Sequence, residues 1–321
     1  MKNNIPSMEN NNKIETLIKK WQGHEGVVVA SANGFNVIDC KYCGFKHITP
    51  IPTEEELEQA YEQDYYIKEK PLYLEQYGKD LEWWNMIYTE RYKILERYLP
   101  TDQRRLLDIG SGPGFFLLNG KNRGWQVKGV EPSKQAAEHS LSIGLDVENI
   151  FFRKKNASTF GFFDAINLGE VLEHIPNPAE LLTLIREQLN ENGLICIIVP
   201  NDFNPFQNAL RDHLDIRPWW VAPPHHINYF DFDSLEKLLE RNSFEVVHKE
   251  STFPIDMFLL MGDNYIGNDE LGRNCHTKRM NFEKTMISSG LSNLLSKLYS
   301  TFASLGIGRE IVIFARKVKE S

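Results

Sequence analysis

Short apolar runs alternate with amphipathic segments along the chain from about residue 105 onward. The apolar runs, which predict strands, lie at 105–109, 126–131, 163–168, 193–199, 244–247 and 311–315. Helices are predicted between the strands at 115–122, at 133–143 and from Asn177 onward. Units that alternate in this way form a mostly parallel sheet with helices on both faces, so the pattern predicts an α/β fold.

Three segments carry residues that favour the start of a helix. Asn177 precedes a proline and suits an N-cap position. Thr53 and Glu56 have the spacing of a capping box. Asp233 and Glu236 have the same spacing, and we expect them to cap the helix that precedes the strand at 244–247.

The N-terminal quarter has a different pattern. Residues 1–12 are rich in asparagine and predict a disordered tail. β-type runs at 27–29 and 35–38 precede a tight knuckle at 40–44, and a longer helix is predicted at 78–98. The chain is therefore divided into a tail (1–12), a ribbon-like and helical addition (13–77), and a main domain (78–321) with an insertion at about 251–308.

Composition narrows the function classes. The chain has 36 basic and 44 acidic residues, a net charge of −8, which disfavours a broad grip on nucleic acid. Four cysteines among 321 residues do not make a disulfide framework. No apolar stretch approaches the roughly 18 residues of a membrane helix, and the N-terminus lacks a signal-peptide pattern. We therefore expect a cytoplasmic protein without a membrane span.

A glycine loop follows the strand at 105–109. Gly110, Gly112 and Gly114 stand between a strand and a helix, where glycines let the backbone approach a nucleotide closely. Glu131 ends the next strand and can accept the hydroxyls of a ribose. The dinucleotide pattern G-x-G-x-x-G is absent, because Phe115 stands where its last glycine would be.

The loop G-x-G-x-G, with Asp108 two residues before it, resembles motif I of the class I S-adenosylmethionine-dependent methyltransferases. Segments 129–133, 163–176 and 189–194 resemble later motifs of that family in the right order. The resemblance implies a Rossmann-like sheet of seven strands and S-adenosylmethionine as cofactor. The residues that it places at the cofactor are Asp108, Gly110, Ser111, Gly112, Gly114, Glu131, Pro132, Leu168 and Glu170.

The family often has an acid or amide after its third strand that reaches the adenine. In this chain that region is the segment 147–152, and the basic residues Lys154 and Lys155 follow it. No adenine contact can be assigned from this segment, although Phe151 or Phe152 can stack on the ring.

The segment 217–230 is rich in Trp, Pro, His and aromatic residues, and its aromatics can equally be core. It resembles the P-x-H-x-x-Y-F stretch of methyltransferases that modify sugars and other small molecules. By that match His226 is the candidate base and His225 its neighbour, although the family often has Glu in place of His225. Histidine titrates near neutrality and suits this role. His174 is a second candidate, although the family uses that position to orient a loop.

The N-terminal addition resembles the head of the same sugar methyltransferases, in which a zinc ribbon precedes a helix and a tyrosine loop over the cofactor. Tyr66 would belong to that loop. Zinc commonly takes two C-x-x-C pairs, and only Cys40 and Cys43 are present. His24 and His47 could complete a site, but we expect both to face solvent. The resemblance therefore favours a ribbon held by packing, with zinc as a minor alternative.

The polar segment 257–280 suits either an acceptor lid or a surface insertion. An apolar stripe follows, which we expect to dock on the chain's own domain: Leu291, Leu294, Leu295, Leu298, Phe302 and Leu305.

The resemblance implies a methyltransferase that acts on a small-molecule acceptor of carbohydrate or sugar-nucleotide type. Three alternatives remain: a quinone, lipid or aromatic acceptor, a non-catalytic methyltransferase-like partner subunit, and a nucleic-acid methyltransferase. An apolar acceptor pocket would favour the first alternative. The intact glycine loop speaks against the second, and the acidic balance against the third. The sequence leaves the methylated atom and the oligomeric state open.

Overall fold

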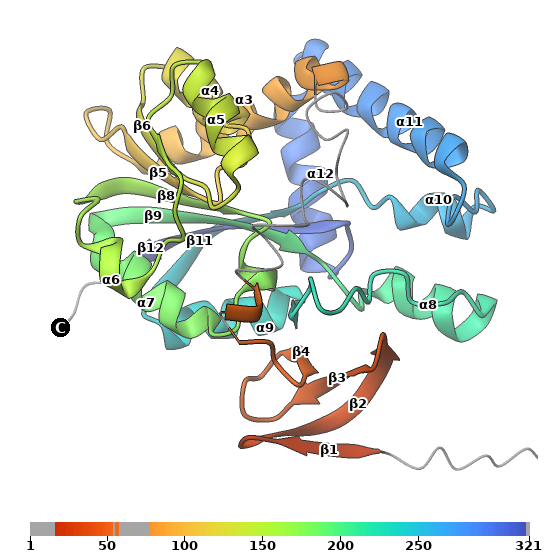
Figure 1. The fold of residues 1–321 in the computed structure, drawn as a ribbon. Helices are drawn as coiled ribbons and strands as arrows, with labels where there is room; N and C mark the ends of the chain where they lie inside the picture. The colour runs from red at the N-terminus through yellow and green to blue at the C-terminus, as the bar shows by residue number, and fades with distance from the viewer. Residues whose placement is uncertain (1–16, 54, 58–77, 319–321) are drawn as a thin grey trace, which may run out of the picture.

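The computed structural model describes residues 17–53, 55–57 and 78–318. Its centre is a seven-stranded sheet in the order β11-β12-β9-β8-β5-β6-β7, in which β12 alone runs antiparallel to its neighbours. The strands are β5 Arg105–Ile109, β6 Gln126–Val130, β7 Val147–Glu148, β8 Phe163–Gly169, β9 Leu189–Pro200, β11 Phe244–Ser251 and β12 Glu310–Lys317. The predicted α/β fold with a mostly parallel sheet of seven strands is confirmed (Figure 1).

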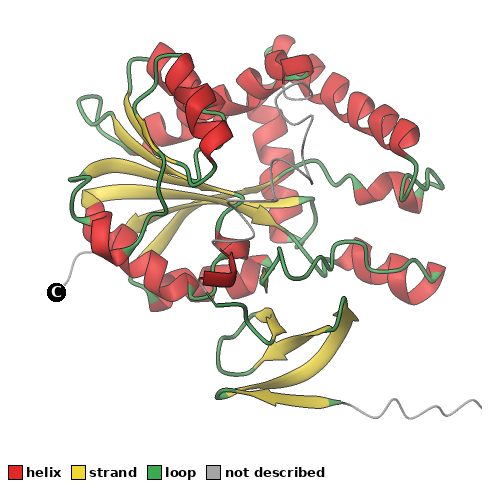
Figure 2. Cartoon of the chain, in the orientation of Figure 1, coloured by secondary structure: helices red, strands yellow, loops and turns green. Residues whose placement is uncertain are grey.

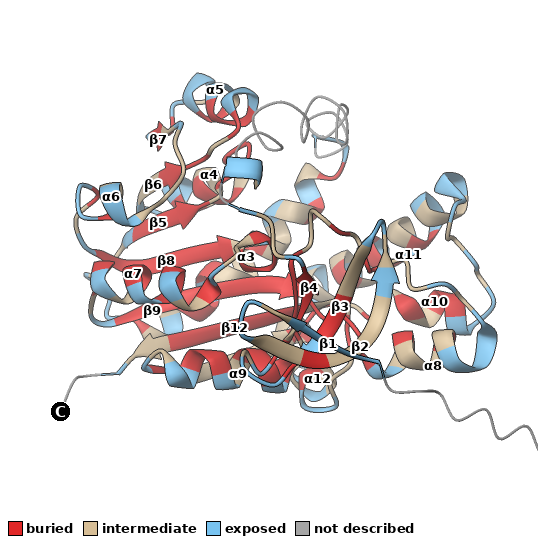
Figure 3. Cartoon of the chain, turned by 60° about the horizontal axis from the view of Figure 1, so that its bottom comes forward, coloured by how far each residue is buried: buried red, intermediate tan, exposed pale blue. Residues whose placement is uncertain are grey.

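Helices cover both faces of this sheet (Figure 2). One layer holds α3 Leu81–Tyr98, α4 Phe115–Asn122 and α5 Lys134–Ser142. The other holds α6 Lys154–Ala157, α7 Pro178–Gln188 and α9 Phe232–Arg241, together with the 3₁₀ turn η2 Leu172–His174. Each layer closes its own apolar cluster against the sheet, which is why the central strands are buried on both sides (Figure 3).

The helix starts agree with the sequence at two of three places. The backbone N–H of Glu180 donates to the Asn177 side chain at 3.3 Å. The Thr53 and Glu56 side chains accept from each other's backbone N–H groups at 3.2 and 2.8 Å. The prediction for α9 is wrong: its N-cap is Asp231, whose carboxylate accepts from the backbone N–H of Ser234 at 2.8 Å.

A second sheet lies beside the main one (Figure 1). Its strands are β1 Ile18–Trp21, β2 His24–Ala32, β3 Phe35–Cys40, β4 Lys46–Thr49 and β10 Asn228–Tyr229, in that order. The last of these comes from the main domain and pairs antiparallel with β4. The N-terminal strands are therefore joined to the main domain by backbone hydrogen bonds as well as by side-chain packing.

Further helices are α8 Pro205–Leu214, α10 Asp256–Leu260, α11 Asp269–Ser288 and α12 Ser292–Ser304. The apolar stripe predicted for the last of these is only partly correct. Leu295 is buried, whereas Leu291, Leu294 and Leu305 are exposed. The buried face of α12 continues through Tyr299 and Ala303 instead. No helix among the described residues has the length and apolarity that crossing a bilayer requires.

A buried carboxylate joins α11 to α3 and α12. Glu283 accepts from the Trp83 indole Nε1 at 2.7 Å and from the Tyr299 hydroxyl at 2.6 Å. The Arg279 guanidinium lies 3.5 Å from the same carboxylate and over the Trp83 ring. Three elements that are far apart in the sequence therefore meet at one charged group.

Replacing Glu283 with Ala should destabilise the fold by about 3 kcal/mol, because it leaves two donors without an acceptor and Arg279 without its counter-charge. Urea unfolding of the variant measures the change in the free energy of unfolding. Glu240→Ala, on the exposed face of α9, is the matched control. Equal stability of the two variants would show that Glu283 does not hold these helices together.

Candidate active site

The glycine loop turns sharply between β5 and α4. Gly110, Gly112 and Gly114 have φ values of +73°, +52° and +82°, in the left-handed region that favours glycine. A Cβ atom at Gly110 would also lie 2.6 Å from a methyl carbon of Val171. Two of the glycines frame Ser111, and the third serves as the N-cap residue of α4. The loop conformation therefore requires the glycines that the sequence shows.

The Glu131 carboxylate fixes the loop from the next strand. Its Oε2 accepts from the backbone N–H of Gly112 and its Oε1 from that of Ser133, both at 2.7 Å. The side chain is buried, and this burial raises the pKa of Glu131 to about 7 against the pull of the two N–H donors. Each oxygen keeps a further lone pair, so a ribose can still donate its hydroxyls here.

Asp108 lies at the base of the same loop. Its Oδ1 accepts from the Asn167 side-chain amide at 2.7 Å, which ties β5 to β8. Burial raises the pKa of Asp108 to about 7, and the nearby charge of Glu131 adds to the effect. The Arg91 guanidinium acts in the opposite direction. Two carboxyl groups thus share one buried region beside the loop.

A cavity of about 780 Å³ opens along these residues. The predicted cofactor residues that line it are Asp108, Gly110, Ser111, Gly112, Glu131, Pro132 and Glu170. Leu168 and Gly114 are not part of the lining: Leu168 is fully buried in β8, and Gly114 caps α4. Tyr66 lies outside the described residues.

The predicted adenine side also lines the cavity. Phe151 and Phe152 both belong to its wall, and the Arg153 guanidinium lies 5.0 Å from the centre of the Phe151 ring. Asn149 supports this segment, because its side-chain amide donates to the backbone oxygens of Glu131 and Pro132. Either phenylalanine is placed to contact a flat ring beside the ribose site.

The three candidate histidines differ in whether they reach the cavity. His174 lines the cavity, whereas His225 and His226 are not among the described residues of its wall. The His174 Nδ1 lies 2.7 Å from the backbone oxygen of His225, which requires a proton on Nδ1 and leaves Nε2 as the basic nitrogen. The His226 ring meets the His174 ring edge-on, with centroids 5.1 Å apart. The three histidines therefore form one group, with His174 at the cavity.

Glu173 lies behind this group. Burial raises the pKa of its carboxyl well above the usual range, and the charge of Glu170 adds to the shift. Its Oε1 lies 3.6 Å from the His174 Nε2, and its backbone oxygen accepts from the Ile227 N–H at 2.8 Å. The turn η2 thus connects the end of β8 to the segment that carries His225 and His226.

Helix α3 contributes residues that sequence reasoning missed. Trp84, Tyr88 and Arg91 all line the cavity. Their spacing of four and three residues places them on one face of a helix, which was the available signal. Asp80 and His276 line the same wall and lie 3.4 Å apart. The segment 257–280 thus reaches the cavity through α11.

Comparisons with known proteins decide the family. A sequence model described as a methyltransferase domain matches residues 83–249, slightly more than half of the chain. The chain belongs to this family. Its glycine loop, Glu131 and seven-stranded sheet identify the domain as one of the S-adenosylmethionine-dependent class, as the sequence predicted.

Curated relatives match over shorter stretches. The ubiquinone biosynthesis O-methyltransferase of Ralstonia nicotianae is 32% identical over 98 residues, which cover 29% of this chain and 41% of that protein. The enzyme of the same name from Chromobacterium violaceum is 28% identical over 111 residues, which cover 33% and 48%. The match thus spans about half the length of these curated relatives.

Solved structures support the fold of this methyltransferase. A methyltransferase from Archaeoglobus fulgidus, described as SAM-dependent, has a TM-score of 0.50 and 17% identity, over 79% of this chain and all of that chain. The plantazolicin methyltransferase BamL, solved with SAH and a triazolic desmethylPZN analogue, has a TM-score of 0.50 and 15% identity, over 82% and 95%. At this identity the likeness concerns the fold alone.

Cys40 and Cys43 lie outside the cavity wall described above. Both are reduced, and they lie beside His24 and His47. The prediction that both histidines face solvent is wrong for His47, which is 0% exposed, and His24 is only partly exposed. The His47 ring packs edge-on against the His24 and Phe45 rings, and no local pattern in the sequence indicates this packing.

Glu131→Gln should weaken the binding of S-adenosylhomocysteine by about tenfold or more, because hydrogen bonds to a charged acceptor contribute about 1.5–3 kcal/mol each. The substitution also turns an amide N–H₂ toward a backbone donor of the loop. Calorimetric titration measures the affinity. Glu148→Gln, an acid at the end of β7 outside the cavity wall, is the control. An equal loss in both variants would contradict the ribose role.

Cofactor binding should strengthen as the pH rises through about 7. The pKa values of Asp108 and Glu131 lie near 7 in the folded protein, against about 4 in an unfolded chain. Below about pH 7 the folded protein without cofactor therefore keeps both carboxyl groups protonated. Because the unfolded chain loses these protons near pH 4, the free energy of unfolding falls as the pH rises from about 4 to about 7. A ribose hydroxyl binds more tightly to an ionised acceptor than to a protonated one, so binding is expected to release protons below about pH 7.

Calorimetry of S-adenosylhomocysteine binding at about pH 6 and about pH 8, in buffers of different ionisation enthalpy, measures both the affinity and the protons released. Affinity that is constant or falls over this range would contradict the assignment of the two carboxyls to the cofactor site.

Proposed function

We propose that this protein is an S-adenosylmethionine-dependent methyltransferase that methylates a hydroxyl group of a small aromatic acceptor of quinol type. The observation that carries the proposal is the single cavity in which the glycine loop and Glu131 share a wall with a set of aromatic side chains. That wall includes Trp84, Tyr88, Phe115, Phe116, Phe151 and Phe152. The names of the curated relatives, ubiquinone biosynthesis O-methyltransferases, point to the same acceptor class.

The apolar lining favours an aromatic acceptor over the sugar that the sequence suggested. Ile175, Leu181 and Leu184 extend the aromatic wall with aliphatic carbon. Flat apolar molecules gain from burial against such a surface, whereas each sugar hydroxyl would need a polar partner. A sugar nucleotide stays as a second candidate, because Lys154 and Lys155 on the same wall could neutralise its phosphates.

Methyl transfer to a hydroxyl is a direct displacement. S-adenosylmethionine held at the glycine loop and Glu131 would supply the methyl group to the acceptor oxygen and would leave as S-adenosylhomocysteine. The protein contributes by holding the oxygen in line with the methyl–sulfur bond, and a base must remove the hydroxyl proton. A phenolic hydroxyl loses its proton near pH 10, far more readily than a sugar hydroxyl does.

We assign the base to the paired rings of His174 and His226. His174 lines the cavity, and the His225 carbonyl fixes its Nδ1 proton, so Nε2 can accept a proton. His226 contacts His174 edge-on and can hold its orientation or share the proton. His225 contributes its backbone oxygen, which assigns it a positioning role.

A screen with isotopically labelled S-adenosylmethionine tests the acceptor class. Hydroxylated benzenes and quinol analogues should become labelled, and sugar nucleotides should not. Labelling of sugar nucleotides alone would replace the aromatic acceptor with the second candidate. Binding of S-adenosylhomocysteine without labelling of any acceptor class would favour a non-catalytic partner subunit.

His174→Asn and His226→Asn should each be measured once an acceptor is labelled. A positioned base contributes about 10²–10⁴ to the rate, so the variant that removes it should lose at least about a hundredfold in kcat. The partner residue should lose less and shift the pH profile. His213→Asn, an exposed histidine on α8, is the control. Two variants that both keep wild-type kcat would exclude the pair as the base.

A further inference from the structure

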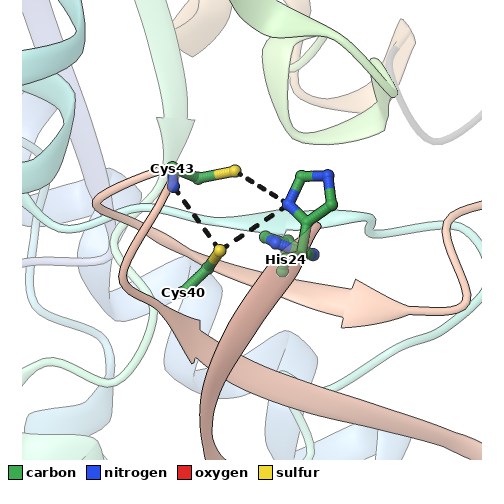
Figure 4. Close-up of side chains that lie close together, drawn as sticks. His24, Cys40 and Cys43 are labelled. Atoms are coloured by element: carbon green, nitrogen blue, oxygen red, sulfur yellow. Dashed lines mark hydrogen bonds between the residues drawn. The ribbon is translucent and has the colours of Figure 1, made fainter. Parts of the chain in front are cut away.

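Four side chains of the N-terminal sheet converge on one point. His24 begins β2, Cys40 ends β3, Cys43 lies in the knuckle after it, and His47 belongs to β4. One ligand atom from each residue lies within 4.8 Å of the others. Figure 4 shows the first three, with both sulfur atoms turned toward the His24 ring.

The distances match those of a tetrahedral metal site. The His24 Nδ1 lies 3.6 Å from the Cys40 Sγ and 3.3 Å from the Cys43 Sγ. Bonds of about 2.3 Å to sulfur and about 2.0 Å to nitrogen, at tetrahedral angles, place the two ligand atoms about 3.5 Å apart. The two observed distances lie on either side of that value.

His47 supplies the observation that packing alone does not explain. The side chain is fully buried, and its Nδ1 lies 2.8 Å from the backbone oxygen of Ile48. Its Nε2 is buried without any hydrogen-bond partner among the described residues. A buried ring nitrogen without a partner is unfavourable. Metal-binding histidines characteristically donate one ring N–H to a carbonyl and turn the other nitrogen to the metal.

The knuckle has the backbone geometry that holds two thiolates together. The backbone N–H of Cys43 points to the Cys40 Sγ at 3.5 Å, and the N–H of Gly44 donates to the Cys40 oxygen at 2.9 Å. Gly44 has a φ of +76°, which favours glycine at the end of the turn. Arg241 of α9 donates to the Cys43 oxygen at 2.6 Å and ties the knuckle to the main domain.

We propose that His24, Cys40, Cys43 and His47 bind one zinc ion as a structural site. Two thiolates and two neutral imidazoles are a ligand set that zinc favours, and all four positions of the tetrahedron are filled by protein. Each thiol gives up its proton on binding, so the complex is neutral overall and suits a half-buried position. The ligand set contains one cysteine pair where two such pairs are usual, with histidines in place of the second.

The zinc site is positioned to brace the acceptor side of the methyltransferase domain. His47 pairs with Asn228 across β4 and β10, and the Ile48 N–H donates to the Ile227 oxygen at 2.9 Å. Ile227 directly follows His226, and its own N–H donates to the Glu173 oxygen at 2.8 Å. Zinc at His47 would therefore fix the strand against which the histidine segment is held.

Metal analysis of the full chain, purified without chelator or added metal, tests the proposal directly. Wild-type protein should contain about one zinc per chain, and removing zinc should lower the Tm. Cys43→Ser should lose the zinc, whereas Cys275→Ser, a buried cysteine on α11 outside the cluster, should keep it. Zinc-free wild-type protein that also fails to take up added Zn²⁺ would overturn the proposal.

Cobalt substitution provides a second test of the zinc site if Cys43→Ser fails to fold. Co²⁺ added to zinc-depleted wild-type protein should give the intense visible absorption of a tetrahedral site with thiolate ligands, and His47→Asn should alter that spectrum. Hydrogen exchange at residues 226–230 should quicken when zinc is removed. Unchanged exchange would overturn the structural role, and the spectrum of an octahedral site would overturn the ligand set.

Discussion

The bond between the Glu131 carboxylate and the glycine loop is the constraint on which the cofactor side of this protein depends. One acid at the end of β6 accepts from Gly112 of the loop and from Ser133 at the start of α5, both at 2.7 Å. The loop and the next βα unit are thereby held in one geometry before any ligand is present. Burial disfavours the charged form of Glu131 and therefore raises the pKa of its carboxyl group. Hydroxyl donors from a ligand would stabilise the ionised carboxylate and lower its pKa, which links binding to the release of a proton.

The sequence predicted the elements that depend on local pattern and missed those that depend on distant partners. Strand 105–109 and helix 115–122 have the observed bounds, because each is set by its own apolar period and by the glycines between them. The start of α9 was misplaced by two residues: the sequence prediction used the spacing of Asp233 and Glu236, whereas Asp231 and Ser234 form the capping box. The apolar stripe of α12 was misread because distant residues set its buried face: Glu283 accepts from Tyr299, and β11 accepts from Ser296 and Ser300.

The candidate site shows the same division. Asp108, Glu131 and the glycines were found because short motifs carry them, and the cavity wall includes most of them. The sequence left the aromatic residues of 217–230 open between core and acceptor site, and Tyr229 and Phe230 are buried: Tyr229 pairs with β4, and Phe230 packs in the main core. Their spacing could not reveal this, because a two-residue strand between two sheets leaves no periodic signal. The aromatic wall of the cavity comes instead from α3, with Trp84 and Tyr88, from the start of α4, and from Phe151 and Phe152.

The junction of the two sheets therefore joins the histidines proposed as the base to the N-terminal addition. The chain passes from His226 through Ile227 into β10. The Ile227 N–H donates to the Glu173 oxygen, and the Ile227 oxygen accepts from the Ile48 N–H. Glu173, Ile227 and Ile48 are all buried, so none of them can shift without opening a packed region. A change in the ribbon that moved β4 would be transmitted to the histidine group by backbone hydrogen bonds, with no need for a mobile lid. The N-terminal sheet is thus joined to η2, whose His174 lines the cavity, by two successive backbone hydrogen bonds.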